Sequence, residues 1–87
     1  MINCVYILFC KDNRYYVGST QNLVKRLNEH QLGRVKATRS RRPIKLIFSQ
    51  DYKTKSEAHR TELWIKKQKS RKLIEQIIKE AIIKKLI

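Results

Sequence analysis

Two short apolar runs near the amino terminus, separated by a polar turn, constrain the fold of this chain more than any other feature. The runs extend over residues 4–10 and 15–20, and the segment between them is Lys11-Asp12-Asn13-Arg14. Apolar runs of this length around a short polar segment predict a β-hairpin with a loop of three to five residues. Tyr6 lies in the first predicted strand and Tyr16 in the second.

The length of the hairpin loop decides whether these two tyrosines lie on the same face of the sheet. Side chains alternate between the faces along a strand, so Tyr6 shares a face with Leu8, and Tyr16 shares a face with Gly18. An odd loop, for example the three residues 12–14 with Leu8 opposite Gly18, brings both tyrosines to one face. The asparagine in that loop tolerates a positive φ. A two-residue loop would send Tyr16 to the other face.

The length and composition predict one small domain over residues 1–87, since 41% of the 87 residues are hydrophobic. Cys4 and Cys10 lie in one predicted strand, roughly 20 Å apart, which is beyond the reach of a disulfide. We therefore expect reduced cysteines and a cytoplasmic protein. The amino-terminal run lacks the features of a signal peptide, and no apolar stretch is long enough to span a membrane.

The formal net charge of +14 and the pI near 10.3 are extreme for a chain of this size. Most of the charge lies in residues 34–87, which contain seventeen Lys/Arg and five acids. A field of this sign favours a polyanionic partner, most often nucleic acid. A lysine-rich helix surface without such a partner is the alternative interpretation.

A first helix is predicted from Asn22, which is a suitable N-cap, to about Leu32, with Gly33 as its C-cap. On a helical wheel, Arg26 and His30 fall within about 60° of the apolar stripe and therefore face toward the sheet. A solvated surface arginine and a half-buried structural histidine are the simpler interpretations of these two residues.

The segment that follows, residues 34–42, is strongly basic and has neither helical nor alternating periodicity, so we expect a loop. Basic loops contact phosphates and position a duplex without determining sequence preference. The alternative is a flexible loop without a partner. Pro43 ends the segment, and residues 44–50 predict a third strand. The residues expected to bind nucleic acid are Arg34, Lys36, Arg39, Arg41 and Arg42.

Two further helices follow. The first is predicted from a cap at Thr54 or Ser56 to about Lys69. Glu62 lies on its apolar stripe, where a carboxylate is costly unless a cation or a metal ion receives it. A salt bridge to a neighbouring lysine or arginine is the alternative. The last helix is predicted from Ser70 and covers the core or forms a dimer contact. Its apolar stripe consists of Leu73, Ile74, Ile77, Ile78, Ala81, Ile82 and Leu86.

The order and spacing of these residues resemble the GIY-YIG nuclease superfamily over roughly residues 3–75. Val5-Tyr6-Ile7 corresponds to the first motif and Tyr16-Val17-Gly18 to the second, while Arg26, His30 and Glu62 follow on the two helices. Within the superfamily, the chain is similar to small single-domain bacterial proteins that resemble the amino-terminal nuclease domain of the excision nuclease UvrC, a DNA-repair enzyme.

The resemblance implies an α+β fold, with a three-stranded antiparallel sheet flanked by helices in the order β-β-α-β-α-α. It also implies hydrolysis of DNA phosphodiester bonds with one divalent cation, Mg²⁺ or Mn²⁺. By the same resemblance, Tyr6 and Tyr16 would activate or orient the attacking water on one face of the sheet. Arg26 would bind the scissile phosphate, His30 would assist the tyrosines, and Glu62 would hold the metal.

These implied roles agree with the chemistry of the side chains. A phenol with a pKa near 10 is ionised to about one part in a thousand at pH 7, so positive charge from Arg26 and the metal is needed to lower that pKa. A neutral His30 is the alternative acceptor of the tyrosine proton. A single carboxylate ligand suits Mg²⁺, which keeps several waters and takes further ligands from the substrate.

The chain departs from the family pattern at several positions. Val5 and Val17 replace the glycine and the isoleucine of the two motifs, and Ser19 stands where some members have a lysine. No asparagine follows Glu62, although many members have one. Two other hypotheses are a non-catalytic nucleic-acid-binding module on the same fold, and a structural or partner-binding protein that uses the last helix. Because so small a domain has little surface for contact with bases, we expect weak specificity or a targeting partner.

Overall fold

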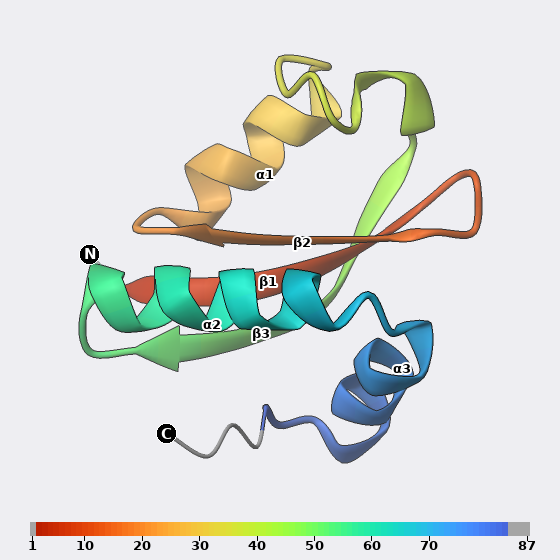
Figure 1. Ribbon diagram of the computed structural model, residues 1–87. Coiled ribbons are helices and arrows are strands. Elements are labelled where there is room, and N and C mark those ends of the chain that lie inside the picture. The colour runs from red at the N-terminus through yellow and green to blue at the C-terminus, as the bar shows by residue number, and fades with distance from the viewer. Residues whose placement is uncertain (1, 84–87) are drawn as a thin grey trace.

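The computed structural model describes residues 2–83 (Figure 1). Its three strands form one antiparallel sheet in the order β2-β1-β3. The predicted fold class and the order β-β-α-β-α-α are confirmed, with one additional short 3₁₀ helix, η1. The elements are β1 (Asn3–Cys10), β2 (Tyr15–Thr20), α1 (Leu23–Gln31), η1 (Arg39–Arg41), β3 (Ile44–Tyr52), α2 (Lys55–Gln68) and α3 (Arg71–Glu80).

The hairpin brings the two tyrosines to the same face of the sheet, as an odd loop requires. Tyr6 lies opposite Gly18, and Leu8 lies opposite Tyr16. This register differs by two residues from the predicted example with Leu8 opposite Gly18. A shift by two keeps every side chain on its face, whereas a shift by one would have separated the tyrosines.

The loop geometry explains the difference in register. The N–H of Cys10 donates to the carbonyl oxygen of Arg14 at 2.9 Å, so the three-residue loop is 11–13 rather than 12–14. Asn13, with φ of 64°, is the last residue of this loop. Three-residue hairpin loops place their left-handed residue at this last position, and the tolerance of asparagine for positive φ therefore fixes the loop one residue earlier than predicted.

Helices cover both faces of the sheet: α1 lies on one side, and α2 and α3 lie on the other (Figure 1). Each face has its own apolar cluster. Cys4 and Cys10 are buried and unpaired, as predicted. Within residues 2–83, no helix has the length and apolar character to cross a membrane. The cluster under α1 contains Tyr6, Leu8, Cys10 and Ile44 together with Tyr16, Leu23, Leu27 and Leu46, and the cluster under α2 and α3 contains Val5, Ile7, Val17, Phe48, Ala58, Ile65, Ile77 and Ile83.

The helices begin where the sequence predicted. The side chains of Asn22, Thr54 and Ser70 each accept a hydrogen bond from the backbone N–H three residues further on. Of the two candidates for the start of α2, Thr54 is the cap, and Ser56 lies inside the helix. Gly33, with φ of 77°, follows the end of α1 in the left-handed conformation that terminates many helices.

The structure corrects three other predicted boundaries. The basic segment was expected to be a loop, but it contains η1. Strand β3 continues beyond its predicted end to Tyr52. Helix α3 ends at Glu80, because Ala81 adopts a left-handed conformation with φ of 57°. Ile82 therefore follows the helix instead of extending its stripe, and Leu86 lies outside the described residues.

Candidate active site

Tyr6 lies at the centre of the candidate site. Its side chain is 1% exposed, and its hydroxyl oxygen is 2.9 Å from Nε2 of His30. The end of the ring lies against Gly18 on the neighbouring strand. A Cβ atom added to Gly18 would be 2.5 Å from both Cζ and the hydroxyl oxygen of Tyr6. A glycine is required there because any side chain would occupy the space of the phenol.

His30 connects Tyr6 to the basic segment. The histidine is fully buried, and its Nδ1 is 2.8 Å from Oγ1 of Thr38, which is also fully buried. A neutral imidazole has one donor and one acceptor nitrogen. When Tyr6 donates to Nε2, Nδ1–H therefore donates to Thr38. Hydrogen bonds on both sides fix the ring. The predicted alternative of a satisfied, half-buried histidine agrees with these hydrogen bonds, but the residue is fully buried.

Burial changes the acidity of both groups. It raises the pKa of Tyr6 to about 12, although the neighbouring Arg26 guanidinium acts in the opposite direction. Burial, followed by the positive charge of Arg26, lowers the pKa of His30 to about 4. The expectation that positive charge would make this tyrosine more acidic is therefore wrong for the domain by itself, because burial outweighs it. At neutral pH the phenol is protonated and the imidazole is uncharged.

Tyr16 lies beside this pair and is only half-buried. Its ring centroid is 6.4 Å from that of Tyr6 and 5.1 Å from that of His30. The ammonium of Lys66 lies 5.4 Å from the centroid of the same ring. Tyr16 is thus the more accessible of the two motif tyrosines, and it lies between the buried pair and the charged residues of α2.

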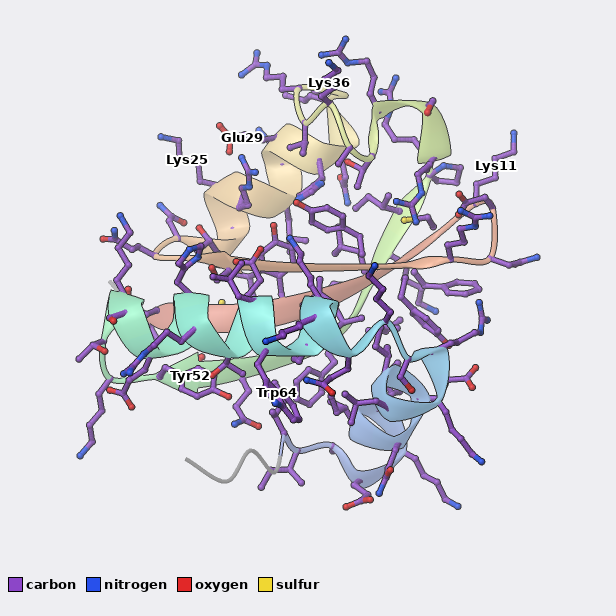
Figure 2. The ribbon with its side chains drawn as sticks, viewed as in Figure 1. Lys11, Lys25, Glu29, Lys36, Tyr52 and Trp64 are labelled. Carbon is purple, nitrogen blue, oxygen red and sulfur yellow. The ribbon has the colours of Figure 1, made fainter. Side chains whose placement is uncertain are left out.

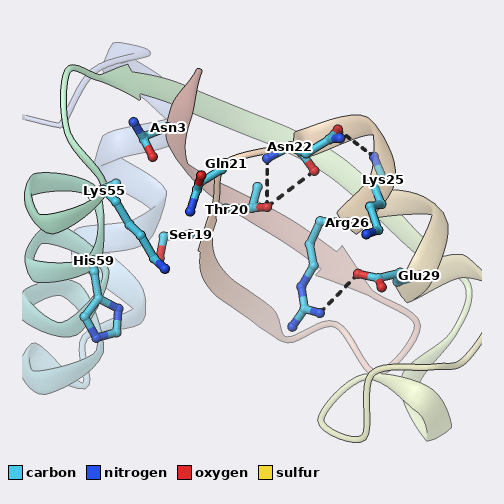
Figure 3. A pocket seen from close by; sticks show the side chains of 11 residues that line it. Asn3, Ser19, Thr20, Gln21, Asn22, Lys25, Arg26, Glu29, Lys55 and His59 are labelled. Atoms are coloured by element: carbon cyan, nitrogen blue, oxygen red, sulfur yellow. Dashed lines mark hydrogen bonds and ion pairs between the residues drawn. The ribbon is translucent and has the colours of Figure 1, made fainter. Parts of the chain in front are cut away.

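Arg26 lines a cavity of about 480 Å³ where β2, α1 and the start of α2 meet (Figure 3). Interaction with the Tyr6 hydroxyl raises the pKa of Arg26, and its Nη1 is 3.3 Å from Oε1 of Glu29. Lys25 and Lys55 line the same cavity. The cavity therefore presents several cations, of which Arg26 interacts with Tyr6, and this is suitable for an anionic group such as a phosphate.

Glu62 reaches the site from the other side of β2. Glu62 is 9% exposed, and each of its carboxylate oxygens accepts a hydrogen bond. Ser19 donates from Oγ to Oε1 at 2.5 Å, and Lys66 donates from Nζ to Oε2 at 2.6 Å. Burial raises the pKa of this carboxyl, but the hydrogen bonds from Lys66 and Ser19 outweigh it, so the pKa lies below its ordinary value. The predicted alternative, a salt bridge to a neighbouring lysine, is present.

The structure thus brings all five predicted site residues together, but not on one face of the sheet. Ser19 alternates with Gly18 along β2 and faces α2 together with Val17, which packs in the cluster under that helix. Tyr6 faces α1. Glu62 therefore approaches the tyrosines around the edge strand β2, and its negative charge contributes to the raised pKa of Tyr6.

The donor set has limited capacity for a metal ion. Within residues 2–83, no group of three or more His, Cys, Asp or Glu side chains is arranged to hold one. An ionised single carboxylate beside a polar cavity fits a Mg²⁺ or Mn²⁺ ion that keeps most of its waters. Such an ion would have to share the Glu62 carboxylate with Lys66 or displace the lysine from it.

The five basic residues predicted to bind nucleic acid have different surroundings. Arg39 and Arg42 donate to backbone carbonyl groups at the end of α1 and within the segment itself. Arg41 forms an ion pair of 2.9 Å with the hairpin loop. Arg34 and Lys36 are exposed, and Lys36 points away from the body of the domain (Figure 2). Among the described residues, the side chains of Arg34 and Lys36 are thus the cations of the segment that are not engaged by a hydrogen bond or an ion pair.

The sequence does not reveal most partners of the predicted residues. Thr38, Ser19 and Lys66 contact His30 and Glu62, and only Lys66 has a signal in the sequence, its position four residues after Glu62 on a predicted helix. The contacts of Thr38 and Ser19 depend on which segments the fold brings together, and a single sequence contains no local pattern for them.

The fold and the site define a class of protein: the chain belongs to the GIY-YIG family, because the family model described as the GIY-YIG catalytic domain matches residues 2–75. This is an endonuclease family whose members act on nucleic acid and generally use a divalent metal. The resemblance of the sequence to the GIY-YIG superfamily is confirmed.

The particular relatives of this chain are UPF0213 proteins. It is 44% identical to the UPF0213 protein YazA of Bacillus subtilis (strain 168) over 63 residues, which cover 71% of this chain and 64% of that relative. It is 46% identical to a UPF0213 protein of Clostridium perfringens (strain 13 / Type A) over 67 residues, 76% of this chain and 72% of the relative. The chain thus spans slightly less than two thirds of the Bacillus subtilis protein.

A solved structure supports the fold. The solution NMR structure of a UPF0213 protein from Bacillus halodurans is 38% identical to this chain and has a TM-score of 0.58. The comparison covers 91% of this chain and 84% of the other. The compact three-stranded α+β architecture is therefore common to both proteins.

Proposed function

We propose that this protein is a metal-dependent endonuclease that hydrolyses DNA phosphodiester bonds with the assistance of a tyrosine. The observation on which this proposal rests most is the buried hydrogen-bonded chain from Tyr6 through His30 to Thr38, beside the guanidinium of Arg26. A structural core would gain little from a phenol, an imidazole and a guanidinium at one point, because each polar group needs a partner there. Phosphodiester hydrolysis uses all three.

Tyr6 and His30 provide a path for the proton of the attacking water. In the tautomer with Nε2 as acceptor, the phenol donates to His30, and the phenol oxygen can accept a hydrogen bond from water. As the water oxygen attacks phosphorus, its proton passes to the phenol oxygen while the phenol proton moves toward Nε2. Tyr16, which is more accessible, orients the water.

The pKa values of Tyr6 and His30 indicate the free energy that this proton transfer requires. With pKa values of about 12 for Tyr6 and about 4 for His30, complete transfer of the phenol proton to the imidazole in the resting domain is uphill by roughly 10 kcal/mol. The transfer must therefore be concerted with attack, so that no free phenolate forms. Arg26 contributes by binding the phosphate and by stabilising negative charge on its oxygens and on the phenol.

Glu62 is the residue that would hold the divalent cation, because it is ionised, nearly buried and next to the cavity. A bound Mg²⁺ would polarise the phosphate and stabilise the leaving oxygen. With one protein carboxylate, most of its remaining ligands would be water and substrate oxygens. Similarity to the excision nuclease UvrC favours a role in DNA repair in the cytoplasm, with a targeting partner that supplies specificity.

A plasmid-nicking assay with Mg²⁺ or Mn²⁺ tests this proposal. Tyr6→Phe and Glu62→Gln should each lower the rate at least about 100-fold, the usual range for loss of an acid–base group or a metal ligand. Tyr52→Phe is the matched control, because its hydroxyl contacts Gln50 on β3, and it should retain the wild-type rate.

The same assay distinguishes the second candidate function. Equal residual nicking by all variants would indicate a contaminating nuclease. If the wild type shows no cleavage above that background but retards DNA in a gel at low salt, the protein is a non-catalytic nucleic-acid-binding module. The pairing of Glu62 with Lys66 is the observation that favours this second candidate.

A further inference from the structure

Glu62 already has a cation beside it, and this cation belongs to the protein. Nζ of Lys66 is 2.6 Å from Oε2, while the other oxygen, Oε1, accepts a hydrogen bond from Ser19 and lies 3.5 Å from Nδ1 of His59. The ammonium thus occupies the oxygen that is not engaged by a neutral group. On an exposed helix surface, a Glu–Lys pair four residues apart would be an ordinary feature with little further meaning.

The two partners of this ion pair differ in their burial. The side chain of Glu62 is 12% exposed, whereas that of Lys66 is 44% exposed. A carboxylate that is shielded from solvent to this extent needs a cation or several hydrogen-bond donors to remain ionised. The lysine has no such need, because its flexible stem can place the ammonium in water. Lys66 is therefore the member of the pair that can leave, and Glu62 is the member that requires a replacement when it does.

We propose that Lys66 is an internal competitor for the divalent cation: its ammonium holds the Glu62 carboxylate in the metal-free protein and moves away when the cation binds. This inference rests on the proposed function, in which Glu62 is the metal ligand. A Mg²⁺ or Mn²⁺ ion held by this carboxylate would lie about 2.1 Å from its oxygen. With the ammonium still bound to the same oxygen, the two cations would be within about 5 Å of each other and would repel.

The surroundings offer the displaced ammonium another place. A second cavity of about 420 Å³ lies between β2 and the helices α2 and α3, and Lys66 is part of its wall together with Tyr16 and Lys69. The ring of Tyr16 has its centroid 5.4 Å from Nζ already. Rotation of the lysine stem would therefore move the charge from Glu62 toward the tyrosine ring and the solvent. Ser19 is neutral and can remain on Oε1.

The metal affinity of the folded protein tests this inference without any measurement of cleavage. Mn²⁺ alone is titrated into the wild type and its variants by calorimetry, and the free Mn²⁺ is followed by electron paramagnetic resonance. Lys66→Met should bind Mn²⁺ about tenfold more tightly than the wild type, because the competing charge is gone. Lys66→Arg retains the charge and should resemble the wild type.

Lys67→Met is the matched control, since it removes the same charge from the next, exposed position of α2. It should change the affinity by less than about twofold. Thermal unfolding of each variant verifies that it is folded at the temperature of the titration. The double variant Lys66→Met, Glu62→Gln should lose the gain entirely.

The outcomes separate this inference from the function on which it rests. If Glu62→Gln abolishes saturable Mn²⁺ binding but Lys66→Met binds no more tightly than Lys67→Met, the competition is absent, and Lys66 is an ordinary helix ion pair. If Glu62→Gln binds Mn²⁺ as the wild type does, Glu62 is not the metal ligand, and the inference is overturned together with that assignment. Weaker binding by Lys66→Met would also overturn it.

Discussion

The buried imidazole of His30 makes the stability of the domain depend on pH. Its pKa is about 4 in the folded protein, while an unfolded chain has the ordinary value near 6.5. Between these values the unfolded state binds a proton at His30 that the folded state does not bind. The free energy of unfolding therefore decreases as the pH falls through this interval, and it rises again with pH until about 6.5.

The first prediction is that the free energy of unfolding is lower at pH 5 than at pH 7.5 by roughly 2 kcal/mol because of His30 alone. The carboxyl groups of Asp12 and Glu62 have lowered pKa values, so their contribution is lost only at pH values below about 4.5. Urea unfolding at the two pH values measures the difference. It should disappear in His30→Gln and persist in His59→Gln, and an equal pH dependence in both variants would contradict the assignment.

The second prediction concerns Thr38, whose hydroxyl is the partner of His30 Nδ1. Thr38→Val keeps the shape of the side chain but leaves the buried nitrogen without a partner, which should lower the free energy of unfolding by about 1–3 kcal/mol. Thr38→Ser keeps the hydroxyl and should cost less. Denaturant titration of the three proteins compares them, and a valine variant as stable as the serine variant would show that the hydrogen bond contributes nothing.

At the scale of elements, the sequence was most informative where structure depends on neighbouring residues. Asn22 was predicted as a cap, Thr54 was one of two candidate caps, and Ser70 was predicted to begin the last helix; each is an N-cap. The left-handed Asn13 was also predicted, but the loop around it was placed one residue too late. The end of α3 was missed, because nothing in the sequence near Ala81 indicates a left-handed residue.

The residues of the candidate site were predicted from the family resemblance. Their pKa values and hydrogen-bond partners were not. Candidate roles for Tyr6, Arg26 and Glu62 could be assigned from the order of the motifs. Their pKa values depend on burial, which a sequence does not give directly. The raised pKa of Tyr6 is the clearest example: burial raises it, although the neighbouring Arg26 by itself would lower it. Long-range partners such as Thr38 for His30 are likewise set by the packing of α1 against the basic segment.

The third prediction uses the contact between the strands β1 and β2. Gly18→Ala should push the end of the Tyr6 ring away from His30, because the new Cβ would lie 2.5 Å from Cζ. We expect a loss of about 1–3 kcal/mol in the free energy of unfolding from overpacking, together with a large fall in nicking activity.

Gly33→Ala is the control for this substitution. Gly33 has φ of 77°, so alanine there is strained and should cost roughly 1 kcal/mol. Its Cβ would meet the flexible guanidinium of Arg42, at the opposite end of α1 from Asn22. This variant should retain nicking activity. Full activity in Gly18→Ala would contradict the role of Gly18 in positioning the phenol.

At the scale of the whole molecule, the net charge of +14 attracts a polyanion from every direction, so affinity for DNA does not by itself locate an interface. The position of a lysine affects the salt dependence of DNA binding only where its side chain contacts a phosphate and releases a counterion from the DNA. Lys36 in the basic segment and Lys79 in the last turn of α3 are both exposed. Lys36 lies on the side of the sheet that α1 covers, and α3 lies on the other side (Figures 1 and 2).

The fourth prediction compares these two lysines, which contribute equally to the net charge. Lys36→Gln should weaken DNA binding and reduce the slope of log K against log salt by about 1, as loss of one phosphate contact does. Lys79→Gln should leave that slope unchanged, because α3 lies across the sheet from the basic segment. Fluorescence anisotropy with a short duplex between about 50 and 200 mM salt measures both slopes. Equal changes in the two variants would mean that DNA is held by the general field of the protein, and that the basic segment is not its binding surface.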